Sequence, residues 1–265
     1  MRGGLARLDE EAHPWRTACA GPRCLPVKPA SPETLALAGL GAALLDFALM
    51  AIIVFAGVDR YAPPQDLPWK PFSLEQPIGM ATARKLASLA DDPAACRAAL
   101  TDGGLTFSEV PLREQGFCST RDGVRITGGA SLSPPGPLMT CGLALTYALW
   151  ERQVAAPAAQ IAFGQPLGRV DHYGTYACRT VYGREGARPS NHATANAVDI
   201  AGFRLVDGRR LTIASDFRDE NAEGRFLRAV RDGACKLFGS TLSPDYNAAH
   251  ADHLHLDRSR YRICR

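Results

Sequence analysis

Residues 197–214 read AVDIAGFRLVDGRRLTIA, two apolar runs separated by Asp207-Gly208. Asp-Gly between two such runs is a strong signal of a tight turn between antiparallel strands, so the segment predicts a β-hairpin. Its first strand carries Asp199 among apolar residues. An ionised carboxylate in that setting is costly unless it is paired or coordinates a metal. Asp199 is therefore either a metal ligand or the partner of one of the chain's many arginines.

Two further segments complete a candidate metal site. Residues 190–199 read SNHATANAVD, which places His192 at the end of a loop that enters the hairpin, and residues 250–257 read HADHLHLD. In a strand, side chains alternate between faces, so His253 and His255 project together while Leu254 and Leu256 point into the core. Catalytic zinc sites use three protein ligands plus water, and zinc accepts both histidine nitrogen and aspartate oxygen. His192, Asp199 and one of the two strand histidines would supply that set.

The motif SxHxxxxxxD followed by HxH resembles the metallopeptidase group that includes the D-Ala-D-Ala carboxypeptidases, the murein endopeptidases and the Hedgehog domains. More closely, residues from about 94 to 265 resemble the bacterial extensin-like C-terminal domain family. The resemblance rests on YACR (176–179), SNHAT (190–194), PDYNAAH (244–250) and DHLHLD (252–257). It implies that His192, Asp199 and His255 bind Zn²⁺. One departure is Ala195, where the family usually has glycine; a left-handed backbone there would cost alanine about 1 kcal/mol.

Peptide hydrolysis also needs a general base that takes a proton from water. The resemblance offers His253, because the first histidine of HxH resembles a catalytic residue in the murein endopeptidases. It also offers Asp252, because the carboxypeptidases carry an acidic base three residues before the ligand histidine. On a regular strand Asp252 points away from the metal face, which favours His253. His250 is a further candidate for substrate contact.

Three other residues are weaker candidates. Arg179 resembles the arginine that these peptidases place upstream of the first motif, where it could hold a carboxylate or a developing oxyanion. A plain surface arginine is the alternative. Asp257 and Asp245 could orient a ligand histidine from behind, but a turn or surface role is favoured for each.

The rest of residues 80–265 predicts an α+β domain, with a small antiparallel sheet carrying the metal site, helices on its other side and disulfides stapling the surface. Residues 80–100 predict two helices, the second beginning at Pro93 after an Asp91 or Asp92 cap. Residues 139–154 predict an amphipathic helix. Residues 173–181 predict a strand, and residues 219–238 a helix that Gly239 can end.

Cysteines indicate the compartment. Six follow an apolar run near the N-terminus and none forms a CxxC pair: Cys96, Cys118, Cys141, Cys178, Cys235 and Cys264. An even number without metal-binding spacing predicts an oxidising compartment and up to three disulfides, with 15 pairings open. Six reduced cysteines in a cytosolic core are the alternative. Cys19 and Cys24 precede the run and are predicted to be free thiols.

The apolar run covers residues 35–57 and is long enough to cross a bilayer. Asp46 at its centre costs about 2.5–3.5 kcal/mol, which the surrounding apolar residues can offset. The alternatives are a signal peptide cleaved near Ala56 and a buried helix with a partner for Asp46. Residues 1–34 predict a disordered cytoplasmic tail. The Pro-rich residues 58–79 predict an extended linker.

These observations predict a zinc metallopeptidase that hydrolyses peptide bonds of peptidoglycan cross-links or stem peptides. It would be a single-pass protein of the inner membrane with its C-terminal domain in the periplasm. Net charge is +3 with basic residues scattered among acids, so no nucleic-acid partner is expected. The sequence points to no particular protein partner. The alternative is a non-catalytic, metal-containing domain that binds the cell wall or a protein; the presence of both Asp252 and His253 favours the enzyme. A structural zinc site is disfavoured because such sites are usually closed by four ligands rich in cysteine.

Overall fold

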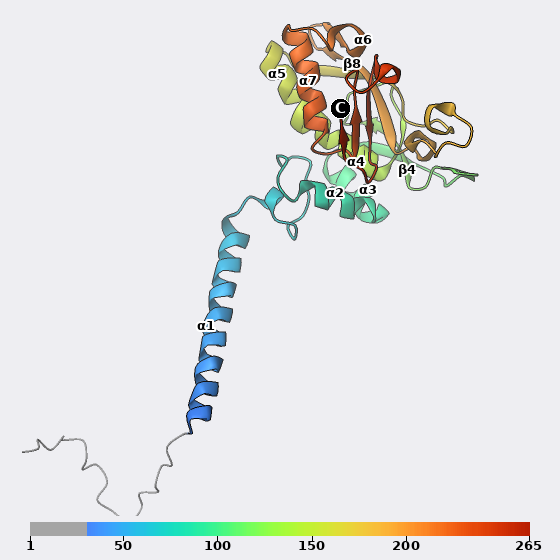
Figure 1. Ribbon diagram of the computed structural model, residues 1–265. Coiled ribbons are helices and arrows are strands. Elements are labelled where there is room, and N and C mark those ends of the chain that lie inside the picture. The colour runs from blue at the N-terminus through green and yellow to red at the C-terminus, as the bar shows by residue number, and fades with distance from the viewer. Residues whose placement is uncertain (1–30) are drawn as a thin grey trace, which may run out of the picture. The chain divides into compact units, whose positions relative to one another are not determined.

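The computed structural model describes residues 31–265 and divides the chain after Arg60 into an N-terminal helix and a compact unit, residues 61–265 (Figure 1). The predicted cytoplasmic tail, with Cys19 and Cys24, lies outside the described residues except for its last four. Of these, Ser31 caps the first helix by accepting a hydrogen bond from the Thr34 amide at 3.3 Å. The tail prediction is therefore wrong for residues 32–34, which belong to a helix.

The first helix, α1, runs over Pro32–Tyr61 and contains the whole apolar run. It is the helix within residues 31–265 that is long and apolar enough to cross a membrane. None of its residues is buried by the described part of the chain. This disagrees with the alternative of a buried helix that shelters Asp46.

The compact unit begins with two helices and six short strands, and helices and strands then follow in mixed order. The helices are α2 Thr82–Ala90, α3 Pro93–Asp102, α4 Cys141–Trp150, a π-helical turn Glu151–Ala155, α5 Ala156–Phe163, α6 Ile213–Asp216 and α7 Ala222–Ala234, with short 3₁₀ turns at Pro64–Asp66, Val181–Gly183, Asn191–Thr194 and Ala248–His250. The strands are β1 Thr106–Val110, β2 Glu114–Gln115, β3 Cys118–Ser119, β4 Gly123–Gly128, β5 Leu132–Ser133, β6 Leu138–Thr140, β7 Leu167–Gly174, β8 Ala197–Leu205, β9 Arg210–Thr212, β10 Ser240–Leu242, β11 Leu254–Asp257 and β12 Ile263–Cys264.

The main sheet has the order β12-β10-β11-β8-β7-β5, with β9 also paired to β8. Its centre is antiparallel, as predicted, whereas the edge pairs β10–β12 and β5–β7 are parallel. Helices cover one face. Phe203 of β8 packs its ring 5.1 Å from that of Phe226 on α7 and 6.1 Å from that of Trp150 on α4. The α+β prediction, with helices against one face of a small sheet, is confirmed.

The predicted helix pair is present, and Asp92 is the cap of α3, accepting hydrogen bonds from the Ala94 and Ala95 amides. The prediction of a helix within residues 139–154 is confirmed, but its predicted amphipathic character is wrong. All ten residues of α4 are buried, because the helix packs against α2 and α3 as well as the strands. Because neighbouring elements cover the helix on all sides, it has no exposed polar face and is not amphipathic. The π-helical turn continues it into α5 as far as Phe163.

Two predicted boundaries also shift. The strand expected over residues 173–181 ends at Gly174, after which the chain leaves the sheet towards Cys178. Helix α7 ends at Ala234 rather than at Gly239. Gly239 instead lets the chain pass closely beside residue 259, since a side chain there would clash with the Ser259 carbonyl oxygen.

The segment predicted as an extended linker packs onto the compact unit. Leu67 and Leu74 are buried. The Lys85 ammonium donates to the Pro64 carbonyl at 2.7 Å, and the Gln153 amide donates to the Leu74 carbonyl at 2.8 Å. Its prolines therefore shape a folded turn region instead of a free spacer.

All six cysteines of the compact unit are paired, as Cys96–Cys141, Cys118–Cys178 and Cys235–Cys264. The prediction of up to three disulfides is confirmed. Their expected surface position is wrong for the first pair, which joins α3 to α4 with both cysteines fully buried.

Candidate metal centre

Two central strands bring together the first pair of candidate ligands. In the antiparallel pairing of β8 with β11, Asp199 lies opposite His255. Their neighbours Val198, Ile200, Leu254 and Leu256 are buried towards the helices. Alternation along both strands therefore turns Asp199 and His255 to the face without helices, where the His255 Nδ1 and an Asp199 oxygen are 2.8 Å apart.

The third candidate, His192, comes from the 3₁₀ turn before β8. Ser190 caps this turn by accepting a hydrogen bond from the His192 amide. Ala195 ends it in the left-handed region at φ 54°, and the chain then enters β8. The left-handed backbone considered for Ala195 is thus present, at a cost of about 1 kcal/mol, and it ends the turn that carries His192 before the chain enters β8.

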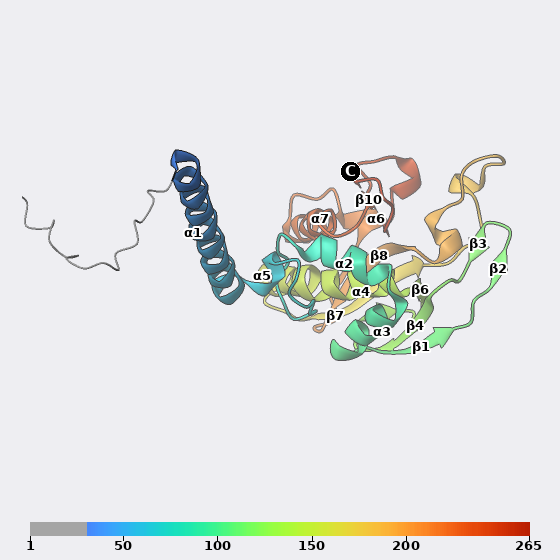
Figure 2. The same cartoon turned by 90° about the horizontal axis from the view of Figure 1, so that it is seen from below.

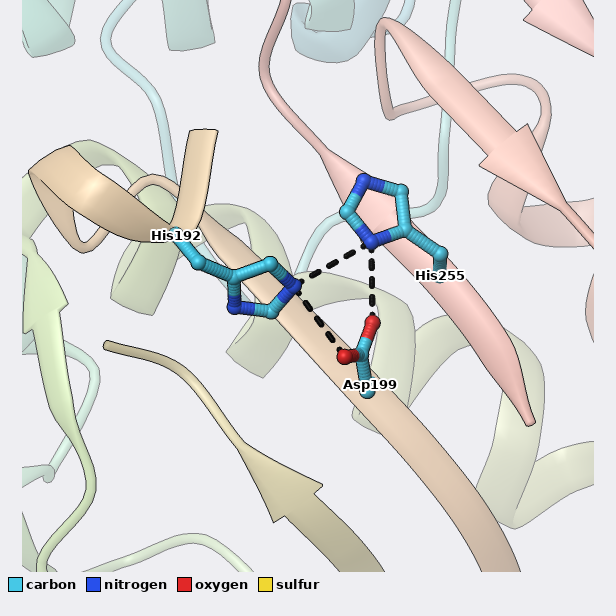
Figure 3. A group of neighbouring side chains, drawn as sticks. All are labelled: His192, Asp199 and His255. Atoms are coloured by element: carbon cyan, nitrogen blue, oxygen red, sulfur yellow. Dashed lines mark hydrogen bonds and ion pairs between the residues drawn. The ribbon is translucent and has the colours of Figure 1, made fainter. Parts of the chain in front are cut away.

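The three side chains form a small triangle (Figure 3). His192 Nε2 lies 3.2 Å from His255 Nδ1 and 3.1 Å from the second oxygen of Asp199. Ligands about 2.0–2.1 Å from a tetrahedral zinc ion are separated by about 3.3 Å. The triangle therefore has nearly the size that one zinc ion requires. In residues 31–265 this is the group of histidine, cysteine and carboxylate side chains whose ligand atoms lie close enough together to share a metal ion.

Hydrogen bonds on the far side of each ring fix where its lone pair points. His192 Nδ1 lies 3.2 Å from the Thr175 carbonyl oxygen, to which it can only donate. His255 Nε2 lies 3.1 Å from the Asp257 carboxylate, and Asn191 donates to the same carboxylate oxygen at 2.7 Å. The remaining nitrogens, His192 Nε2 and His255 Nδ1, then present lone pairs to Asp199. Two lone pairs facing a carboxylate need a cation between them, and both a metal ion and a proton fit.

The role favoured for Asp257, a turn or surface residue, is thus wrong, because its buried carboxylate orients a candidate ligand. Asp245 takes the expected surface role and pairs with Arg231 at 3.2 Å. The position of each aspartate relative to His255 along the strand could have distinguished the role of Asp257 from that of Asp245. Asp257 lies two residues after His255 on the same strand, so its side chain shares the face of the site.

The charges follow from this arrangement. Burial alone would raise the pKa of Asp199, but hydrogen bonds and charge from His192 and His255 outweigh burial and lower it. Burial alone would lower the pKa of His255, but its hydrogen bonds with Asp199 and Asp257 outweigh burial and raise it to about 9. Without a metal ion, a proton therefore stays on His255 at neutral pH.

His253 and Asp252, the two candidates for the general base, are hydrogen-bonded to each other. The Asp252 carboxylate accepts from His253 Nδ1 at 2.8 Å, which leaves the lone pair on Nε2, 3.6 Å from Asp199. Asp252 is half exposed and does not line the pocket. It lies in the turn before β11, which begins only at Leu254, so the predicted strand does not extend to Asp252 and His253. The Tyr173 ring packs edge-on against His253. Tyr173, which sequence reasoning missed, therefore helps to hold the ring.

His250 is neutral and oriented. Burial and the nearby His253 and His255 lower its pKa to about 4. Its Nδ1 donates to the Asn247 side-chain oxygen at 2.7 Å, while the Asn247 amide donates to the Tyr182 hydroxyl at 3.0 Å. The His250 Nε2 is therefore an acceptor. Neither Asn247 nor Tyr182 stands out in the sequence as a site residue.

A pocket of about 210 Å³ contains these side chains and reaches Arg179. Arg179 lies on a loop whose two sides pair at Thr180 and Pro189, which also brings Arg188 to the pocket. Both arginines are exposed, and no carboxylate of residues 31–265 lies within ion-pair distance of either guanidinium group. Sequence reasoning missed Arg188, because the pairing of the loop's two sides is not visible in its composition.

The three comparisons with known proteins give one match. The model of the family described as Extensin-like protein C-terminus matches residues 94–265, well over half of the chain. Neither the curated proteins nor the solved structures contain a match. The matched region begins in α3 and includes every strand and every candidate site residue. The chain belongs to the family of extensin-like protein C-termini.

Proposed function

We propose that this protein is a zinc-dependent peptidase that cleaves peptide bonds of peptidoglycan, in cross-links or stem peptides. The observation that carries the proposal is the convergence of His192, Asp199 and His255. The nitrogen lone pairs of two histidines, fixed from behind, and one carboxylate meet at the spacing of a zinc site with an open fourth position. A structural zinc site would instead need a fourth protein ligand.

The chain's own residues supply the rest of a hydrolytic reaction. Zinc held by the triangle would act as a Lewis acid that activates water and polarises a peptide carbonyl. The lone pair of His253 Nε2 accepts the proton of the attacking water, while Asp252 holds the ring and stabilises the imidazolium that results. The same ring returns the proton to the leaving amine. Arg179 and Arg188 bind a substrate carboxylate, and the His250 Nε2 accepts a hydrogen bond from a substrate amide.

The envelope setting is supported by two features. Three disulfides within residues 61–265 suit an oxidising compartment, and α1 suits a span of the inner membrane with the compact unit in the periplasm. Peptidoglycan is the peptide polymer that such a domain faces, and both endopeptidase and carboxypeptidase action fit the site. The proposed substrate therefore follows from location, and the proposed chemistry from the site.

The deciding experiment measures zinc in the purified full chain and its release of peptides from murein, before and after chelation. About one zinc per chain with chelator-sensitive release supports the peptidase. One zinc without hydrolysis would favour a domain that binds the cell wall without cutting it. No zinc would contradict the metal site.

A pair of histidine variants sharpens this test. His255→Ala is expected to lose both zinc and activity. His172→Gln is the matched control, because His172 is a buried histidine of the same sheet that holds the Pro134 carbonyl at 2.8 Å and lies outside the triangle. Equal loss in both variants would show general damage to the sheet and would remove support for the ligand assignment.

A further inference from the structure

The loop that carries the two pocket arginines ends in a tip, residues 180–189, which we call the tip loop. Its backbone hydrogen bonds run within the loop, and one of them joins the Val181 amide to the Arg188 carbonyl oxygen at 2.9 Å. In the part of the chain that the structure describes, one hydrogen bond joins the tip loop to the rest of the compact unit. The Asn247 side-chain amide donates it to the Tyr182 hydroxyl at 3.0 Å. The position of the tip loop therefore depends on Tyr182.

Tyr182 has an unusual backbone conformation and a well-held side chain. Its φ is 57°, in the left-handed region that is rare for bulky residues. Such a conformation persists where the surrounding structure holds it, and it is common near functional sites. The ring packs edge-on against His250, with centroids 6.4 Å apart, and the Arg184 guanidinium lies 5.3 Å from the ring centroid. Together with the hydroxyl contact, these interactions hold Tyr182 in the wall of the pocket.

The partner of Tyr182 is fixed independently of the tyrosine. The Asn247 side-chain oxygen accepts hydrogen bonds from the Ala249 amide at 3.0 Å and from His250 Nδ1 at 2.7 Å. A backbone amide can only donate, so this oxygen must face Ala249, and the Asn247 nitrogen then faces the Tyr182 hydroxyl. Loss of the hydroxyl would therefore leave Asn247 and His250 in place and release the tip loop alone.

We propose that Tyr182 is a positioning residue, whose hydroxyl holds the tip loop so that Arg188 stays in the pocket with the candidate metal ligands. The hydrogen bond between Val181 and Arg188 ties the backbone of Arg188 to the residue beside Tyr182. The Arg188 side chain lines the same pocket as the metal triangle. The inference rests on the proposed function, in which Arg188 binds a substrate carboxylate. Because Tyr182 acts through Arg188, its loss should weaken substrate binding and leave the chemical step unchanged.

The first test compares Tyr182→Phe with the unmodified full chain, loaded with zinc, in steady-state hydrolysis of soluble muropeptides. KM is expected to rise about threefold to tenfold, the effect of one hydrogen bond, while kcat and zinc content stay unchanged. Tyr261→Phe is the control, because it removes a hydroxyl from an exposed tyrosine that does not line the pocket. An unchanged KM in Tyr182→Phe, or a fall in kcat alone, would overturn the inference.

A double-mutant cycle tests whether Tyr182 acts through Arg188. Arg188→Gln alone is expected to raise KM about tenfold to 100-fold, because it removes a charged hydrogen bond to the substrate. Adding Tyr182→Phe to Arg188→Gln should raise KM no further, since the hydroxyl then has no arginine to position. A full additional rise would show that Tyr182 acts on the substrate or on the fold without Arg188, and it would overturn the positioning role.

Hydrogen exchange distinguishes failure of this inference from failure of the proposed function, because it needs neither zinc nor substrate. The Val181 and Arg184 amides donate hydrogen bonds within the tip loop. In Tyr182→Phe these amides should exchange about threefold to tenfold faster, whereas in Tyr261→Phe they should not. Unchanged exchange would overturn the inference even in an active peptidase. Faster exchange in a chain that does not hydrolyse murein would contradict the proposed function and leave the attachment of the tip loop by Tyr182 standing.

Discussion

At the scale of single residues, the central feature is the His255 imidazole, which lies between two carboxylates. Asp199 faces Nδ1 at 2.8 Å and Asp257 faces Nε2 at 3.1 Å. Both raise the pKa of His255, to about 9. A proton and a metal ion therefore compete for the same nitrogen, and the ring favours a cation in either case.

This competition predicts how the stability of metal-free protein depends on pH. The folded pKa of His255 lies above its unfolded value of 6.5, so its contribution is fully present below pH 6.5 and is lost as the pH rises to about 9. Thermal melts of chelated protein from pH 6 to 9.5 should show this loss, and the His255→Gln variant should lack it. An equal loss in that variant would assign the effect to another group.

The carboxylate behind His255 predicts a change in metal affinity. In Asp257→Asn the amide no longer enforces the Nε2–H tautomer, and zinc affinity should fall about 10–100-fold. Competition with a chromophoric chelator measures this. Asp245→Asn is the control, because Asp245 pairs with arginines at the surface. Unchanged affinity in Asp257→Asn would show that the carboxylate has only a structural role.

Variants of the Asp252–His253 pair should lower kcat without loss of zinc. His253→Gln should keep its zinc but lose about 10²–10⁴-fold in kcat, the range for removal of a general base. Asp252→Asn should lose less, because the base remains and only its orientation and charge change. Single-turnover assays on murein peptides would measure both. A larger defect in Asp252→Asn than in His253→Gln would make Asp252 the base.

At the scale of elements, the site is assembled from two kinds of support. The triangle of His192, Asp199 and His255 is carried by β8, β11 and the turn before β8, whereas Arg179 lies on a loop outside the sheet. The Cys118–Cys178 disulfide ties this loop to the β2–β3 hairpin immediately before Arg179. Figures 1 and 2 show the hairpin projecting from the unit beside β4 and β6.

Removal of that disulfide should therefore affect substrate binding more than metal binding. In Cys118→Ala with Cys178→Ala, zinc content should stay near one per chain while KM rises, because the loop carrying Arg179 is less ordered. Loss of zinc would contradict our view that the sheet positions the candidate ligands independently of the loop that carries Arg179. Cys96→Ala with Cys141→Ala is the control. Loss of that buried disulfide should lower the melting temperature without a selective effect on KM.

The elements also show what could be predicted from the sequence. The two ligand strands were predictable because alternation and Asp207-Gly208 are local signals, and α3 was predictable from Asp92 and Pro93. The fully buried α4 was misread, because its environment depends on helices and strands distant in the sequence. Arg188 was missed for the same reason, because it has ordinary loop surroundings and only the tertiary fold brings it to the site. Asn247 lies in the PDYNAAH segment that carries the family resemblance, but its role in holding His250 is visible only in the structure.

At the scale of the whole molecule, α1 and the compact unit are two separate bodies joined at Tyr61. The Pro-rich segment was misread as a spacer because proline indicates extended backbone but does not report whether neighbouring residues such as Leu74 are buried. In the proposed function membrane association depends on α1, the helix of residues 31–265 that is long and apolar enough to cross a membrane and that contains one central acidic residue, Asp46.

Further charges near Asp46 should therefore prevent α1 from inserting into a membrane. Each additional charge at the centre of a span costs about 2.5–3.5 kcal/mol. Leu45→Lys with Met50→Lys should therefore release the full chain into the carbonate-soluble fraction. Lysines in place of Pro63 and Gln65, beyond the end of α1, are the control and should leave it in the membrane. Retention of the α1 variant would mean that membrane association does not depend on the helix.

The connectivity of the disulfides has a consequence for how the protein is made. Counted along the chain, the first cysteine of the compact unit pairs with the third, the second with the fourth and the fifth with the sixth. If the chain is exported behind α1, as the proposed function requires, Cys96 and Cys118 meet the oxidant before Cys141 has emerged. Oxidation in order of emergence would then join the wrong pair, and only thiol–disulfide exchange could correct it. Correct production of this domain should therefore require a disulfide isomerase, and a host with an oxidant alone should accumulate chains linked between Cys96 and Cys118.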